Sequence, residues 1–148
     1  DWRQCDGWYE CEDCLRWPLD PPLTPEGIAS ARRVGQQLAL ELKDDEVHSA
    51  PFTLVSSPFF RCVQTAVELC RAAGPGFRII LDNELGEIYG PEVFGDVEPE
   101  DGVLRTLEES ILYCRQNGVE LERVPIGRQP MWPESVSGAR FRLLCRFL

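Results

Sequence analysis

The chain has 148 residues, a formal net charge of −10, and a 43% share of hydrophobic residues. This length and composition are typical of one folded domain with a sizeable core, and they exclude a disordered chain. The acidic balance argues against nucleic acid or an anionic membrane surface as a partner. No apolar run is long enough to span a membrane, so we expect a cytoplasmic protein.

The first predicted regular element is a helix that follows Thr24. Thr24 is a favourable N-cap residue, and Pro25 suits the first helical position. Apolar residues then recur every three or four positions, which predicts one buried face. This face comprises Ile28, Ala31, Val34, Leu38 and Leu42. Residues 1–19, rich in Cys and Trp, are expected to form an irregular lead-in to a single domain.

Two short strands and a second helix follow in the sequence. Phe52 to Val55 predicts the first strand. Ser57 is expected to cap a helix that begins at Pro58 and ends at Gly74-Pro75-Gly76. The run Phe77 to Leu81 predicts the second strand.

The second half of the chain predicts two more helices. An irregular acidic stretch extends to about Gly102, and a helix is expected from about Val103 to Gln116. After a turn at Asn117-Gly118 and a loop, a final helix is expected from Ser135 to the end. Strands that alternate with helices predict an α/β domain with a mainly parallel sheet.

The seven cysteines do not form a disulfide pattern. Four of them occupy apolar positions of predicted helices, which indicates small buried side chains in a reducing compartment. They are Cys62, Cys70, Cys114 and Cys145. Cys5, Cys11 and Cys14 lie in the lead-in, where Cys11-x-x-Cys14 has the spacing of half a zinc site. No second pair completes four ligands, so we expect free thiols and no metal.

The turn after the first strand is the strongest candidate site. In open α/β sheets, ligands bind beyond the carboxyl ends of the strands, and the N–H groups of a helix start attract anions. Arg61 stands in the first helical turn, where a cation is unfavourable unless an anion is nearby. Its guanidinium matches phosphate oxygens. From the residues alone, a phosphate site and a surface Arg on a well-capped helix are equally open.

Four segments resemble those of a known family. Residues 56–66, SSPFFRCVQTA, resemble the Ser-Ser-Pro-x-x-Arg-x-x-Gln-Thr-Ala motif of the histidine phosphatase superfamily, also called the phosphoglycerate mutase-like family. Residues 20–38 resemble its Pro-Leu-Thr-x-x-Gly-x-x-Gln-Ala segment, with Ser30 where Gln is usual. Residues 81–90 resemble its acidic Leu-x-Glu-x-x-x-Gly segment, slightly compressed. Residues 132–144 resemble the helix before the family's last catalytic strand.

The resemblance implies a fold and a chemistry. The fold would be a three-layer α/β/α domain. The reaction would be a two-step phosphoryl transfer through a His nucleophile, without a cofactor. Arg61 would bind the phosphate and act in catalysis, Ser57 would also contact the phosphate, and Glu87 would be the general acid and then the base. The implied partner is a phosphorylated small molecule or a phosphoprotein.

The sequence departs from the family at the nucleophile. The family carries its catalytic His in an Arg-His-Gly or Arg-His-Ala motif, and a second His follows the last strand. His48 is the single histidine here, no Arg precedes it, and we interpret it as a surface residue. The simplest account is an incomplete domain that starts after the first strand and stops before the last. A truncation, a splice form and a decayed relative would all look like this.

These residues lead to one expected function, one main alternative and one mechanism that the sequence does not fit. We expect the parent protein to hydrolyse phosphate monoesters and this chain to be inactive alone. The main alternative is a non-catalytic domain of the same fold that binds a protein partner or a phosphorylated ligand. A Cys-based phosphatase would need a Cys several residues before an Arg. Cys62 instead follows Arg61, which fits packing better.

Overall fold

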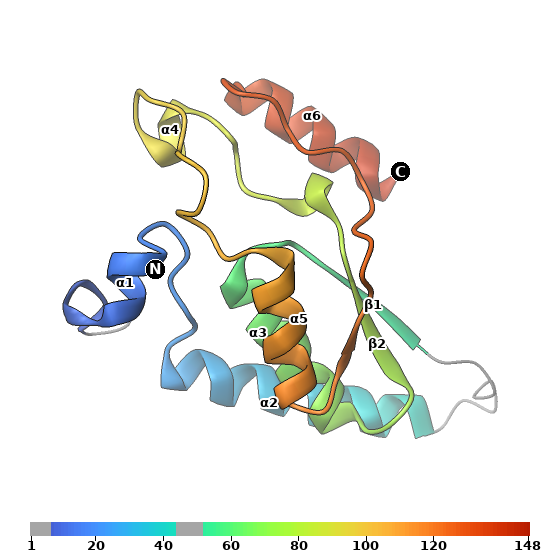
Figure 1. The fold of residues 1–148 in the computed structure, drawn as a ribbon. Coiled ribbons are helices and arrows are strands. Elements are labelled where there is room, and N and C mark those ends of the chain that lie inside the picture. The colour runs from blue at the N-terminus through green and yellow to red at the C-terminus, as the bar shows by residue number, and fades with distance from the viewer. Residues whose placement is uncertain (1–6, 44–51) are drawn as a thin grey trace.

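The computed structural model describes residues 7–43 and 52–148 of the chain. Its sheet has three parallel strands in the order β1-β2-β3, which are β1 (Phe52–Ser56), β2 (Phe77–Leu81) and β3 (Glu120–Leu121). The longer helices are α2 (Pro25–Lys43), α3 (Phe60–Ala73), α5 (Leu107–Gln116) and α6 (Val136–Phe147). The shorter ones are η1 (Trp8–Glu10), α1 (Glu12–Arg16), η2 (Asn83–Leu85) and α4 (Pro91–Phe94). Figure 1 shows their arrangement.

The sheet confirms the predicted α/β class and the parallel pairing. β1 and β2 pair in register, with Phe52 opposite Phe77 and Ser56 opposite Leu81. α3 connects these two strands and packs with α5 on one face of the sheet. The core lies at this contact and contains Val63, Ala66, Val67, Cys70, Ile79, Leu81, Cys114, Val119 and Leu121.

The opposite face of the sheet is more open within the described residues. Val55 on this face is exposed and Ile80 is half-buried. α6 contacts η2, beyond the carboxyl end of β2, and lies apart from the α2–α3–α5 group in Figure 1. This end of the sheet is where the predicted site residues gather.

α2 begins as predicted, but its buried face differs. The hydroxyl of Thr24 accepts a hydrogen bond from Gly27 N–H at 3.1 Å, as an N-cap should. Ala31 and Gly35 are buried, whereas Val34 is 54% exposed, so the predicted stripe was wrong at that position. The reason is the close approach of α3. A Cβ on Gly35 would stand only 2.7 Å from the carbonyl oxygen of Leu69.

Two predicted helix starts were also wrong. α3 begins at Phe60 rather than Pro58, because Phe59 keeps an extended backbone, and Ser57 is therefore not its N-cap. α5 begins at Leu107 rather than Val103, because Thr106 and Glu109 form a reciprocal capping box. The strand β3 was not predicted, since two residues carry too little pattern to recognise.

The lead-in is more ordered than expected. Within its described part, residues 7–19, η1 and α1 replace the irregular stretch, and Trp8 is buried. Arg16 forms an ion pair with Glu109 of α5 at 2.9 Å. Cys5 and His48 lie outside the described residues.

The cysteines divide into buried and exposed thiols. Cys70 and Cys114 are buried in the core as predicted, and burial raises their pKa to about 11 and about 12. Cys62 is half-buried. Cys145 is exposed, so its predicted burial was wrong; it lies near the end of α6, outside the core.

None of the helices described in residues 7–43 and 52–148 combines the length and the apolar character that crossing a bilayer requires.

Replacing Gly35 with Ala should destabilise the fold by about 1–3 kcal/mol, because the new methyl group overpacks the contact between α2 and α3. It would meet the Leu69 carbonyl oxygen and, at 2.8 Å, the Cβ of Ala72. The gain of about 1 kcal/mol in helix propensity does not offset this overlap. Gly27→Ala in the same helix is the control, because its nearest neighbour is the flexible side chain of Leu23. Urea denaturation of both variants measures the difference. Equal stability would contradict the tight contact.

Candidate functional site

Arg61 and Glu87 lie together beyond the carboxyl ends of two neighbouring strands. Arg61 is in the first turn of α3, after β1, and Glu87 lies in the loop after η2, which follows β2. Arg61 Nη2 lies 3.8 Å from Glu87 Oε2, and their side chains are 36% and 37% exposed. The structure therefore brings together the two predicted catalytic residues. Their roles in catalysis stay predictions.

Local contacts orient Arg61. Its guanidinium carbon lies 4.6 Å from the centre of the Phe59 ring, a favourable cation–π distance. Its carbonyl oxygen accepts a hydrogen bond from the Thr65 hydroxyl at 2.8 Å. The motif residue Gln64 accepts a hydrogen bond from Leu23 N–H at 2.6 Å, which joins this helix to the segment before α2. Several polar positions of the motif thus hold the turn in place.

A buried carboxylate already occupies the start of α3. Asp20 is 1% exposed, and its Oδ1 accepts the N–H of Phe60 at 2.8 Å. Burial raises the pKa of Asp20, while this N–H, the N–H of Arg105 and the Arg105 guanidinium lower it. The first amide of α3 is therefore engaged by Asp20 and is not free to bind a phosphate.

Arg105 completes this buried cluster. Its side chain is 4% exposed, and its guanidinium carbon lies 4.1 Å from the ring centre of Trp17 and 3.8 Å from that of Phe60. It donates to the Asp20 carbonyl oxygen at 2.7 Å and to the Asp13 carboxylate at 2.8 Å. Sequence reasoning missed both Asp20 and Arg105, because the residues that they contact lie 40 to 92 positions away.

Ser57 and Cys62 form a neighbouring pair. Ser57 is half-buried, its side chain hydrogen-bonds the Cys62 thiol, and its carbonyl oxygen accepts from the Ser56 hydroxyl at 3.0 Å. The predicted role of Ser57 at the phosphate is not tested by this arrangement. Burial raises the pKa of Cys62 above its ordinary value, although Arg61 opposes the shift. Cys62 is therefore a neutral thiol near pH 7, unlike a catalytic Cys nucleophile.

The loop that carries Glu87 is held by Arg142 of α6. The Arg142 guanidinium donates to three carbonyl oxygens, that of Glu84 in η2 and those of Gly86 and Glu87 in the loop. It also forms two parallel bonds to the Glu134 carboxylate, at 2.7 and 2.8 Å. Such a two-bond pair fixes geometry as well as charge. Arg142 is thus a positioning residue for Glu87, which no local pattern in the sequence indicates.

Two further contacts fasten the same loop. Glu134 Oε2 accepts the N–H of Tyr89 at 3.0 Å, two residues after Glu87. Arg146, one turn beyond Arg142, pairs with the buried Asp82 at the end of β2. α6 and Glu134, which lies just before it, therefore anchor the loop on both sides of Glu87.

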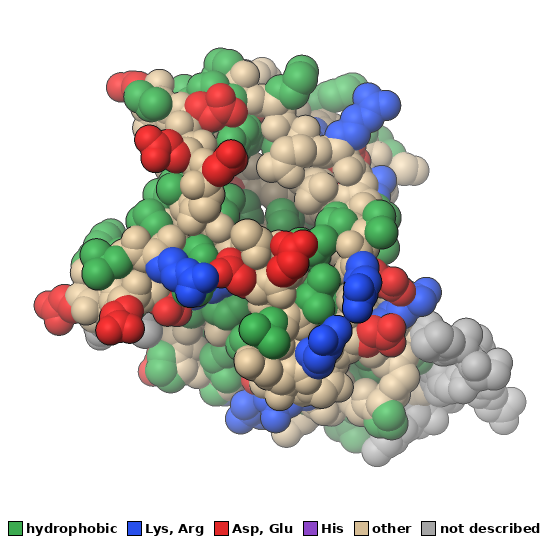
Figure 2. Space-filling view, viewed as in Figure 1, with side chains coloured by type: hydrophobic (Ala, Val, Ile, Leu, Met, Phe, Trp, Pro, Cys, Tyr) green, Lys and Arg blue, Asp and Glu red, His purple; other side chains and the backbone are tan. Residues whose placement is uncertain are grey.

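A cavity of about 180 Å³ opens beside Glu87. Its apolar lining includes Phe59, Tyr89, Phe94 and Leu104, while Glu87 and Arg105 contribute charge. The nearby α4 and the segment after it carry exposed acidic residues, which are Glu92, Asp96, Glu98, Glu100 and Asp101. Figure 2 shows acidic side chains gathered around α4. The field around this cavity disfavours additional negative charge on a ligand.

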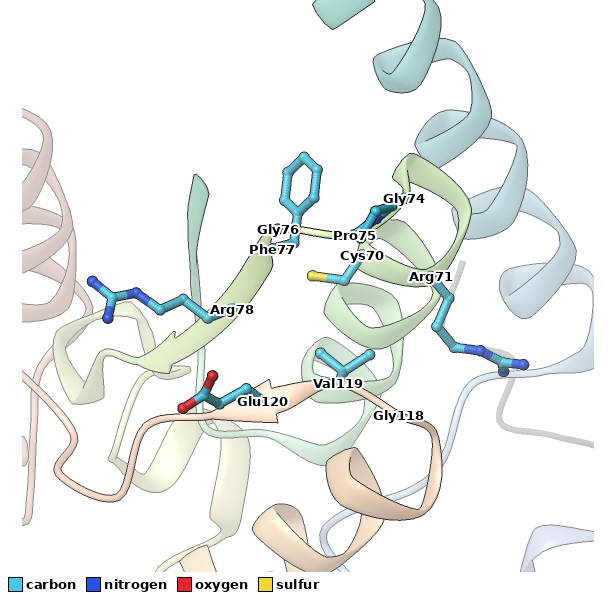
Figure 3. Close-up of a pocket in the computed structure, with 10 residues that line it drawn as sticks. All are labelled: Cys70, Arg71, Gly74, Pro75, Gly76, Phe77, Arg78, Gly118, Val119 and Glu120. Atoms are coloured by element: carbon cyan, nitrogen blue, oxygen red, sulfur yellow. The ribbon is translucent and has the colours of Figure 1, made fainter. Parts of the chain in front are cut away.

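A larger cavity, of about 690 Å³, lies at the other end of the sheet. It is formed by the turn 74–76 before β2 and the turn before β3, and Figure 3 shows Arg71 and Arg78 directed away from it. These two arginines pair with Glu68 at 3.3 Å and Glu122 at 2.9 Å. Since its cations are engaged elsewhere, we do not assign the phosphate to this cavity.

No metal-type cluster is found within the described ranges. There, no three or more His, Cys, Asp or Glu side chains are grouped to hold a metal ion. In the Cys11-x-x-Cys14 segment, the thiol of Cys11 donates to the Trp8 carbonyl oxygen at 3.0 Å.

Replacing Glu134 with Gln should destabilise the protein by about 2 kcal/mol at neutral pH, because the bonds to a charged partner are lost. The bonds to Arg142 hold the pKa of Glu134 below its ordinary value of 4.5. A lowered pKa means that the ionised form stabilises the folded state. This contribution is complete above pH 4.5 and is lost as the pH falls through the folded-state pKa.

The difference in unfolding free energy between wild type and Glu134→Gln should therefore shrink as the pH falls below 4.5. Denaturant titrations at pH 7, 5, 4 and 3 measure it. Glu122→Gln is the control, since Glu122 pairs with Arg78 at the surface and should contribute less than about 1 kcal/mol. A difference that grows in acid would contradict the assigned role of Glu134.

The comparison with protein families agrees with this geometry. Residues 8–102 match the family model of the histidine phosphatase superfamily (branch 1), which is more than half of the chain. The match contains Asp20, Arg61 and Glu87. It begins at residue 8, whereas the first motif that resembles the family begins at residue 20. It ends before α5 and α6, so the resemblance of residues 132–144 stays a prediction. No curated protein matches the chain. The chain belongs to the histidine phosphatase superfamily.

Proposed function

We propose that this chain provides the Arg61 and Glu87 part of a phosphate site, and that the complete parent protein hydrolyses phosphate monoesters. Membership of the family supports the reaction class. The observation that carries the residue assignment is the approach of Arg61 and Glu87 to 3.8 Å beside a cavity. A cation and a carboxyl group at the carboxyl ends of parallel strands are what this chemistry requires.

In the proposed reaction, the phosphate enters beside the Arg61–Glu87 pair. The Arg61 guanidinium donates to non-bridging phosphate oxygens and stabilises the charge that they carry in the transition state. The long contact of 3.8 Å to Glu87 is easily exchanged for shorter bonds to phosphate. Ser57 is proposed as a further donor to the phosphate. Glu87 then faces the oxygen that leaves.

The proposed chemistry has two steps. In the first, a histidine nitrogen forms a bond to phosphorus while the bond to the leaving oxygen breaks, and Glu87 gives its proton to that oxygen. In the second, water attacks phosphorus, Glu87 takes a proton from this water, and the phosphorus–nitrogen bond breaks. The products are the free alcohol and inorganic phosphate.

The histidine nucleophile is not assigned to this chain. His48 is the one histidine of the sequence, and it lies outside the described residues. Its acidic sequence context, without a preceding Arg, does not match the family's nucleophile motif. We therefore place the nucleophile on another part of the parent protein and expect the 148-residue chain alone to show no turnover.

Steady-state hydrolysis by the protein encoded by the complete gene tests this function. Arg61→Gln should lower kcat/KM at least 100-fold, in line with the loss of one preorganised donor. Glu87→Gln should slow phenyl phosphate more than p-nitrophenyl phosphate, because the poorer leaving group needs the proton more. Arg78→Gln is the control, since Arg78 is a half-exposed, ion-paired Arg at the other end of β2.

Three outcomes would contradict the assignment. Equal losses in Arg61→Gln and Arg78→Gln would show a general charge effect. Turnover by the 148-residue chain that His48→Ala abolishes would make His48 the nucleophile. A complete protein that binds phosphate through Arg61 without turnover would favour the alternative, a non-catalytic domain that binds a phosphorylated ligand or partner.

A further inference from the structure

We propose that the cavity beside Glu87 is a pocket for the aromatic ring of an aryl phosphate monoester. The inference rests on the proposed function for the phosphate end of this ligand. It adds the chemical class of the leaving group, which would be a planar ring without further negative charge.

The first argument is size. The cavity has a volume of about 180 Å³. An apolar cavity of about 150 Å³ is large enough to bind benzene. The space beside Glu87 therefore fits one six-membered ring, and a larger group would have to extend into solvent.

The second argument is the lining. Phe59 and Phe94 present nearly parallel rings with centres 6.4 Å apart, and Tyr89 meets Phe94 edge to face at 5.7 Å. Leu104 adds aliphatic surface. Aromatic side chains in these orientations offer both faces and edges to a bound ring, and such contacts stabilise beyond the buried area alone.

The third argument is the connection between the ring pocket and the charges. Phe59 lines the cavity, and the Arg61 guanidinium lies over the Phe59 ring. Glu87 also lines the cavity and lies 3.8 Å from Arg61. A phosphate at Arg61 would thus stand at the mouth, with the ester oxygen next to Glu87 and its ring directed inward.

The same surroundings disfavour sugar phosphates. Buried hydroxyl groups need hydrogen-bond partners, and burial without them is costly. Among the polar lining residues, Arg105 is already engaged by Asp13 and Asp20, so the side-chain amides of Asn83 and Gln129 would have to serve the several hydroxyl groups of a sugar. The acidic segment from Glu92 to Asp101 repels a second phosphate. An aryl monoester avoids both costs.

Binding of three small probes to the 148-residue chain tests the pocket. The probes are phenylphosphonate, methylphosphonate and the neutral ring 4-fluorophenol, followed by calorimetry or fluorine NMR. We expect phenylphosphonate to bind at least tenfold more tightly than methylphosphonate. Phe94→Ala should remove this preference and weaken 4-fluorophenol, while methylphosphonate binding stays unchanged. Arg61→Gln should weaken both phosphonates and leave 4-fluorophenol unaffected.

Matched variants keep the test decisive. Phe141→Ala removes an exposed aromatic ring from α6 and should change none of the three affinities. Phe94→Leu retains apolar bulk without the ring, and it replaces Phe94→Ala if circular dichroism shows that the latter unfolds. In Phe94→Leu we expect a reduced preference for phenylphosphonate.

The outcomes separate this inference from the proposed function. Equal binding of both phosphonates, dependent on Arg61, would overturn the aromatic pocket and leave the phosphate site standing. Binding of 4-fluorophenol that depends on Phe94, with phosphonate binding indifferent to Arg61, would overturn the proposed function. In that case the ligand inferred here would have no phosphate group bound at Arg61. A chain that binds none of the probes would overturn both.

Discussion

The buried carboxylate of Asp20 is the constraint on which the phosphate end of the site depends. It accepts the N–H groups of Phe60 and Arg105, so it fixes the first residue of α3 and the approach to α5 at once. A buried carboxylate is costly unless donors surround it, and Arg105 also supplies a nearby positive charge. Arg61 follows Phe60 directly, so its place depends on this cluster.

A separate set of contacts holds Glu87. Arg142 and Glu134 join α6 to the loop after η2, through bonds that involve backbone oxygens rather than the Glu87 carboxylate itself. The backbone of Glu87 is thereby fixed, while its carboxylate accepts the N–H of Ile88 through Oε1 at 3.2 Å and presents Oε2 to Arg61. Two independent anchors, one in the first half of the chain and one in α6, bring a cation and a carboxyl group together. Their mutual contact of 3.8 Å is long, so Arg61 can exchange it for shorter bonds to a ligand.

Local chemistry explains which parts of the fold the sequence could predict. Thr24, Gly74 and Ser135 mark helix ends through their own backbone preferences, and the structure confirms these boundaries. The meeting of Arg61 and Glu87 was expected from the family resemblance rather than from local chemistry, and it agrees with the position of each residue after the carboxyl end of a parallel strand. Competition from distant groups explains the failures. Asp20 reaches the start of α3 from 40 residues away, and Ser57 is left to contact Cys62 instead.

A backbone amide NMR titration of the 148-residue chain with inorganic phosphate tests most directly that these anchors build the anion site. The account predicts that the largest shifts occur at residues 59–62 and 86–89, at the carboxyl ends of β1 and β2. Shifts concentrated at residues 74–78 and 118–120, around the larger cavity at the opposite end of the sheet, would contradict it.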